Sequence, residues 1–95
     1  MAYVLIHHKV ARYQDFEAVF KDDGERRRRL GSKGGTVFTD TQDPQSVFIL
    51  LEWDNVEGAE KFAGGWETRE AMEWATSERQ ASEIWVIENR LEVEV

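Results

Sequence analysis

The sequence predicts an α+β fold whose elements follow the order β-α-β-β-α-β. Three observations carry this prediction. Short apolar runs typical of strands occur near both ends of the chain, two stretches show apolar residues at helical spacing, and a turn-forming segment separates two strand-like runs in the middle. The chain has 95 residues, of which 41% are hydrophobic. This size suits a single domain over residues 1–95.

The first half of the chain is predicted to contain a strand, a helix and a hairpin. Tyr3–Val10 is rich in β-branched and aromatic residues, as strands are. Tyr13–Leu30 carries apolar residues near one face at helical spacing, and Gly31 is suited to end that helix. The hairpin is predicted from two strands and the turn between them: Thr36–Thr41, residues 42–45 and Val47–Trp53.

The second half is predicted to contain a helical region and the last strand. Asp54, with Glu57 three residues later, resembles a capping box and predicts a helix start. The glycine pair at 64–65 is expected to interrupt this helix, and a further helical stretch runs from about Trp66 to Thr76. Two segments complete the chain: a strand over Glu83–Glu88 and an alternating tail, 91–95, that continues it.

This order is that of the ferredoxin-like arrangement, a four-stranded antiparallel sheet with two helices on one face. The strands are apolar on both faces in Tyr3–Ile6, Val47–Leu51 and Ile84–Ile87. Exposing about six to eight large apolar side chains, at about 1.5–3 kcal/mol each, exceeds the roughly 5–15 kcal/mol by which domains are stable. We therefore expect a second copy to cover the open face, giving a homodimeric α+β barrel.

Charge and composition exclude several function classes. The chain has 12 Lys and Arg against 19 Asp and Glu, a net charge of −7, which disfavours a nucleic-acid partner. It has no cysteine and only two histidines, so we expect no disulfide, no metal site and a reducing, cytoplasmic location. Apolar runs of about five residues predict no membrane span, and no leader typical of export precedes Tyr3.

The run Arg26–Arg29 has two interpretations. It could contact an anion or a phosphate group, or it could be a solvated part of a helix. The second interpretation is favoured, because four consecutive residues point all around a helix and cations near a helix C-terminus interact well with its dipole.

Four segments resemble a known superfamily: His7-His8-Lys9-Val10, Gly31–Gly35, Leu51–Asn55, and the stretch from Ala59–Ala63 to Arg69–Met72. They resemble the dimeric α+β barrel superfamily, and within it the small antibiotic-biosynthesis-monooxygenase-like proteins. The resemblance implies one of several activities: oxygenation of aromatic polyketides without metal or flavin, haem degradation, isomerisation or decarboxylation. Several relatives carry a histidine near the position of Phe62, so haem degradation by that route is not expected here.

The leading expectation is therefore a homodimer that binds a small apolar molecule, aromatic or polyketide-like, and that needs no cofactor. If it is an enzyme, the resemblance implies that a base deprotonates the substrate, which then reacts directly with O2. A ligand-binding protein without turnover and a pure assembly module are the alternatives.

Candidate site residues follow from the faces of the strands. We expect the helix-covered face to be wholly apolar and the other face, which lines the barrel interior, to carry a few polar groups. The side chains predicted to face the helices are then Val4, Ile6 and Val10 on the first strand and Val47, Ile49, Leu51 and Trp53 on the third. The inward side chains are predicted to be Tyr3, Leu5 and His7 on the first strand, and Phe48, Leu50 and Glu52 on the third.

His7 is the predicted general base, because imidazole titrates near neutral pH; the alternative is a surface or hydrogen-bonded core histidine. His8 is the predicted base instead if the two faces of the first strand are assigned the other way round. Glu52 could orient the histidine or act as a base, or it could be a solvated or paired carboxylate. Tyr3 could hold a substrate oxyanion, or it could lie at the dimer contact.

The aromatic and C-terminal residues give further candidates. Trp66 and Trp85 could stack on a flat ligand, although packing explains them equally well, and Trp53 and Trp74 are assigned to the core. Asn89 and its neighbour Arg90 could contact a ligand oxygen. No nucleophilic triad is expected, since no serine stands near a histidine in a recognisable pattern.

Overall fold

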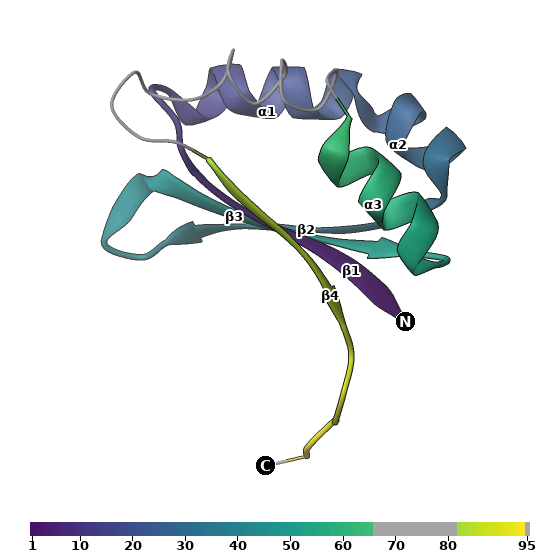
Figure 1. Ribbon diagram of the computed structural model, residues 1–95. Helices are drawn as coiled ribbons and strands as arrows, with labels where there is room; N and C mark the ends of the chain where they lie inside the picture. Colours follow the sequence, from purple (N-terminus) through teal and green to yellow (C-terminus); the bar gives the residue numbers. More distant parts are fainter. Residues whose placement is uncertain (66–81, 95) are drawn as a thin grey trace.

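The computed structural model describes residues 1–65 and 82–94. Its elements, in chain order, are β1 (Ala2–Lys9), α1 (Tyr13–Asp22), α2 (Gly24–Leu30), β2 (Ser32–Asp40), β3 (Asp43–Trp53), α3 (Val56–Gly64) and β4 (Glu83–Glu88). The labelled helices lie together on one side of the sheet (Figure 1). The predicted helix Trp66–Thr76 lies outside the described residues.

The four strands form one antiparallel sheet in the order β2-β3-β1-β4. This confirms the predicted fold class and places β1 and β3 in the middle. In register, Leu5 of β1 lies between Leu50 of β3 and Trp85 of β4. Residues that share a row across the sheet therefore come from distant parts of the sequence.

The core lies between the sheet and the helices. Alternate residues of β1 and β3 point into it, as the apolar pattern predicts. Trp53 is fully buried, and its ring centroid lies 5.0 Å from that of Phe62 on α3. The assignment of Trp53 to the core is thus confirmed, whereas Trp74 lies outside the described residues.

The single helix predicted over Tyr13–Leu30 is two helices. α1 ends at Asp22 and α2 begins at Gly24, because Asp23 and Gly24 are both poor helix formers in a helix interior. The Asp23 carboxylate accepts hydrogen bonds from Nε (2.8 Å) and Nη2 (2.7 Å) of Arg26. The predicted stop at Gly31 is confirmed: its φ of 114° is the left-handed conformation that suits glycine.

The hairpin is longer than the pattern predicts. β2 begins at Ser32 instead of Thr36, and β3 begins at Asp43, so the turn shrinks to Thr41 and Gln42. β3 contains Pro44, which has no N–H to donate. The register is irregular here: Asp40 pairs with Asp43 and Thr39 with Val47, so Pro44 has no partner on β2.

Two predictions at the element ends are wrong. Asn55, not Asp54, caps α3: its Oδ1 accepts a hydrogen bond of 2.7 Å from the Gly58 N–H, while Asp54 pairs with Lys33. The tail 89–94 is not a strand. Glu88 pairs with Ala2, where β1 begins, and beyond that pair the Asn89 N–H bonds to the Met1 carbonyl oxygen, close to the start of the chain. The tail leads away from the sheet as the yellow segment of Figure 1.

No helix within the described residues has both the length and the apolar composition needed to cross a bilayer.

Candidate functional site

The face of the sheet opposite the helices, here called the open face, carries the alternate residues that the core does not use. On β1 these are Tyr3, Leu5, His7 and Lys9, each partly exposed, whereas the residues between them are buried. The strand pairing places Phe38, Ser46, Phe48, Leu50, Glu52, Glu83, Trp85 and Ile87 on the same face. The predicted sides of β1 and β3 are therefore confirmed.

Polar groups of three strands meet at His7. Its Nε2 lies 2.9 Å from Oγ of Ser46 on β3, and its Nδ1 lies 3.5 Å from Oε1 of Glu83 on β4. The imidazole also stacks on Phe48, with ring centroids 4.5 Å apart and an interplanar angle of 24°. Ser46 is buried and His7 is partly exposed, so solvent or a ligand can reach the imidazole of His7 more readily than the Ser46 hydroxyl.

The two polar partners, Ser46 and Glu83, favour one arrangement of the protons on His7. An ionised carboxylate only accepts hydrogen bonds, so Glu83 favours the tautomer with its proton on Nδ1. Nε2 then accepts from the Ser46 hydroxyl. A group arranged in this way can take a proton at Nε2 and hold the resulting positive charge against the Glu83 carboxylate.

Sequence reasoning missed both partners. No serine stood out beside a histidine in the sequence, yet Ser46, 39 positions from His7, lies within hydrogen-bond distance of it. One of the two interpretations of Glu52 was that it orients the histidine, whereas the carboxylate at His7 is that of Glu83. Only the strand register could have identified them, because each lies on a strand that pairs with β1.

Lys9, two residues after His7 on β1, forms its ion pair with Asp43. Its ammonium group pairs with Asp43 of β3, and this hydrogen bond lowers the pKa of the Asp43 carboxyl. Lys9 lies opposite Ser46 in register, so this pair closes one end of the polar group.

His8 lies on the other side of the sheet. It is buried, its ring meets Phe16 of α1 edge-on at 5.2 Å, and its Nδ1 lies 3.1 Å from Oγ of Ser82. Burial, and then the charge of His7, lower the pKa of the His8 imidazole to about 4. His8 is therefore neutral near pH 7, and it does not share the open face with His7.

Tyr3 and Glu52 lie opposite each other at the far end of the open face. His7 lies four positions after Tyr3 on β1, which is about 13 Å at 3.3 Å per residue. The structure therefore brings these two predicted site residues together but does not bring them to His7.

Comparison with known structures identifies the fold. No family model matches the sequence, and no curated protein matches it. SnoaB, a cofactor-independent oxygenase from Streptomyces nogalater, superposes with a TM-score of 0.75 at 16% identity, over 97% of this chain and 95% of that chain. An antibiotic biosynthesis monooxygenase structure from Deinococcus radiodurans superposes with a TM-score of 0.73 at 13% identity, over 100% and 98%. One from Bordetella bronchiseptica gives 0.73 at 18% identity, over 95% and 97%. The chain has the antibiotic biosynthesis monooxygenase fold. The fold that the sequence resemblance implies is therefore confirmed.

In this chain's version of the antibiotic biosynthesis monooxygenase fold, two aromatic residues flank the middle of the open face. Phe48 is 37% exposed and Trp85 is 42% exposed, and Leu5 and Leu50 complete the surface between them. Trp66, the other predicted aromatic wall, lies outside the described residues.

Asn89 lies just beyond β4, away from His7. Its backbone N–H donates to the Met1 carbonyl oxygen at 3.2 Å, and its side-chain amide donates to Glu92 at 2.9 Å. Asn89 and Arg90 are both exposed.

Within residues 1–65 and 82–94, no three histidine or carboxylate side chains gather in a way that could hold a metal ion. Phe62 is buried against Trp53.

Proposed function

We propose that this chain acts as a cofactor-independent oxygenase on a small aromatic or polyketide-like molecule, bound against the open face of a homodimer. The observation that supports this most directly is the position of His7. A histidine with a hydroxyl at one ring nitrogen and a carboxylate at the other lies within a surface of aromatic and aliphatic side chains.

In this proposal Nε2 of His7 removes a proton from the bound substrate, directly or through the Ser46 hydroxyl. The electron-rich anion then reduces O2. One oxygen atom enters the substrate as a new carbonyl group, and the other leaves as water with the two hydrogens that the substrate loses. The charge on the imidazole is balanced by Glu83, which lies 3.5 Å away.

The open face also favours a flat, elongated substrate. Phe48 stacks on His7 and would extend a ring-binding surface toward the base. Trp85, and Trp66 as predicted from the sequence, would stack on the remaining rings. Tyr3 would reach an oxygen of the substrate only if the molecule spans about 13 Å from His7.

The homodimer is supported by the apolar side chains of the open face. Phe38, Phe48, Trp85 and Ile87 are each between 37% and 51% exposed in the single chain. Covering such a face stabilises a complex by about 1.5–3 kcal/mol for each large side chain that becomes fully buried. A second copy presents the same apolar face, so two sheets can pack by a two-fold axis. Sedimentation at micromolar concentration tests this, and a stable monomer would contradict it.

Oxygen uptake tests the catalytic part of the proposal. We expect wild-type protein to consume O2 with at least one member of a panel of dihydroxyaromatic and quinol compounds. His7→Gln should lower the rate by about 10²–10⁴-fold, the usual contribution of a general base. Thr39→Ala is the control, because Thr39 lies opposite Val47, a core residue, on the other side of the sheet from His7. Equal rates for wild type and His7→Gln would contradict the assignment of the base.

A ligand-binding protein without turnover is the second candidate function. The exposed aromatic rings of Phe48 and Trp85 support it as well as they support an enzyme. Saturable quenching of tryptophan fluorescence by a compound that causes no O2 uptake would favour binding alone. The absence of both effects would favour an assembly role.

A further inference from the structure

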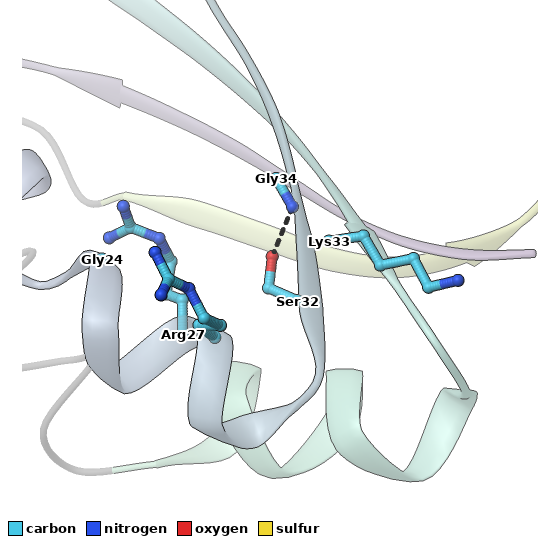
Figure 2. A pocket seen from close by; sticks show the side chains of 6 residues that line it. Gly24, Arg27, Ser32, Lys33 and Gly34 are labelled. Atoms are coloured by element: carbon cyan, nitrogen blue, oxygen red, sulfur yellow. Dashed lines mark hydrogen bonds between the residues drawn. The ribbon is translucent and has the colours of Figure 1, made fainter.

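A hollow lies between α2 and the first residues of β2, in a part of the molecule separate from His7. Figure 2 shows Arg27 on the helix side of the hollow and Ser32 and Gly34 on the strand side. The hollow has a volume of about 560 Å³ and is open to solvent on one side. Its lining residues are Gly24, Arg27, Arg28, Ser32, Lys33 and Gly34. This volume lies within the range of small-molecule sites in proteins.

The lining has the opposite charge to the chain as a whole. The chain carries a net charge of −7, yet three of the six lining residues are cationic and none of the six is acidic. The carboxylate of Asp23, the residue before α2, is already bound at both oxygens by Arg26, and Arg27 Nη1 is 3.8 Å from it. Within the described residues, Arg28 has no ion pair.

The arginine run divides into two pairs with different surroundings. Arg26 and Arg27 are largely buried, with side chains 16% and 11% exposed, and lie over the rings of Phe62 and Phe20 at 5.3 and 3.8 Å. Arg28 and Arg29 are exposed. The predicted solvated helix face therefore holds only for the second pair.

Packing fixes the position of Arg27 at the hollow. Stacking on Phe20 restrains the guanidinium, and burial lowers its pKa because the charged form loses water. A bound anion would offset this loss of hydration. The fork of a guanidinium group also matches the oxygen atoms of a phosphate or a carboxylate.

Two glycines, Gly24 and Gly34, border the hollow. Gly34 has a φ of 111°, a conformation that suits glycine, and a Cβ there would meet nothing within 4 Å. A Cβ on Gly24 would lie 3.5 Å from Nη2 of Arg27, so that guanidinium lies close to the backbone. The Lys33 side chain extends away from Arg27 (Figure 2) and pairs with Asp54 at 3.1 Å. The two arginines are thus the cations left to meet a ligand.

We propose that this hollow binds the phosphate or carboxylate group of a small anionic molecule, with Arg28 as the free cation and Arg27 as the fixed one. Ser32 borders the same space. Its hydroxyl donates to the Glu52 carbonyl oxygen at 3.2 Å and accepts from the Gly34 N–H, so it shapes the wall of the site.

A titration with inorganic phosphate, followed by amide NMR, tests the site. We expect saturable shifts confined to residues 24–34, and weaker binding as salt rises. Arg28→Gln should weaken binding by about fivefold or more, since charge-assisted hydrogen bonds are lost. The matched control is Arg29→Gln, which removes the same charge from the next position but from a residue outside the lining. It should change the affinity by less than about twofold.

Three results would overturn the proposal: no saturable shift with either phosphate or acetate, equal weakening by Arg28→Gln and Arg29→Gln, or shifts that centre on other residues. Comparing phosphate with acetate distinguishes the two ligand groups. Thermal unfolding of both variants checks that the fold is intact.

Discussion

His7 and Ser46 are diagonal neighbours on β1 and β3, with Nε2 of the imidazole 2.9 Å from the serine Oγ. Their contact depends on the antiparallel register that pairs His7 with Phe48 and Lys9 with Ser46. Because Glu83 approaches the other ring nitrogen from β4, β1 carries the histidine and each of its two neighbouring strands supplies one partner. This arrangement leads to a direct spectroscopic prediction.

The carboxylate of Glu83 should select the tautomer of His7. In wild-type protein at a pH where imidazole is neutral, we expect the proton on Nδ1, seen in the ¹⁵N shifts of the ring nitrogens. Glu83→Ala should increase the share of the tautomer with its proton on Nε2. Glu88→Ala, at the other end of β4, should leave the His7 signals unchanged. A wild-type ring already protonated at Nε2 when neutral would contradict this prediction.

Burial of His8 should make the fold sensitive to mild acid. The folded imidazole has a pKa of about 4, against 6.5 for an ordinary histidine. The unfolded chain therefore binds more protons between these values, so the free energy of unfolding falls as the pH falls from 6.5 toward 4. The loss attributable to His8 is about 2–3 kcal/mol when complete. Above pH 7 this contribution is constant.

Urea unfolding at pH 7.5 and at pH 4.5 measures this effect. His8→Phe, which keeps a ring against Phe16, should lose less stability between the two pH values than the wild type does. Carboxylates titrate in both proteins, so the difference isolates the histidine. The same loss in both proteins would refute the prediction.

Two glycines should respond to alanine in opposite directions. A Cβ on Gly35 would overlap the backbone of β3 at the Leu50 carbonyl oxygen and lie 2.9 Å from Leu51 Cα. Gly35→Ala should therefore lower the free energy of unfolding by about 2 kcal/mol or more. Gly64, the last residue of α3, has open space around it, so Gly64→Ala should raise stability by about 0.5–1 kcal/mol. Chemical denaturation measures both, and a neutral Gly35→Ala would contradict the close approach of the strands.

Two tryptophans should have separable roles. Trp53 is fully buried against Phe62, and Trp53→Ala should cost about 3–5 kcal/mol of stability. Trp85 lies on the open face, so Trp85→Ala should weaken association of two copies more than it weakens the fold of one. Urea unfolding and sedimentation of both variants separate the two effects. If the two variants lose self-association to the same extent, the prediction of separate roles is wrong.

Much of the fold could be predicted because the sequence pattern reflects burial. The bounds of β4 match the predicted Glu83–Glu88, and the alternation on β1 places Val4 and Ile6 in the core. The break between α1 and α2 at Asp23 was missed because the apolar residues before and after it fit the spacing of a single continuous helix. The predicted N-cap of α3, Asp54, was one residue before the observed cap, Asn55, because both are good capping residues.

The site could be predicted only in part. Periodicity placed His7 on the correct side of the sheet, since period-two alternation depends on one strand alone. Its partners depend on how β1 aligns with β3 and β4, and a shift of one residue would exchange the faces. The sequence alone therefore could not predict that Ser46 and Glu83 contact His7. Nor could it predict that Arg27 and Ser32 border the same hollow.

The placement of Glu83 has a consequence for how such a protein can diversify. It is the first residue of an edge strand and is exposed, whereas His7 belongs to a central strand that is hydrogen-bonded on both sides. Replacing the peripheral carboxylate removes the acceptor beside Nδ1 of the histidine without removing any buried side chain. The hydrogen-bond partners of His7 and the packing of the core thus depend on different positions, and variation at residue 83 can alter the first while leaving the second intact.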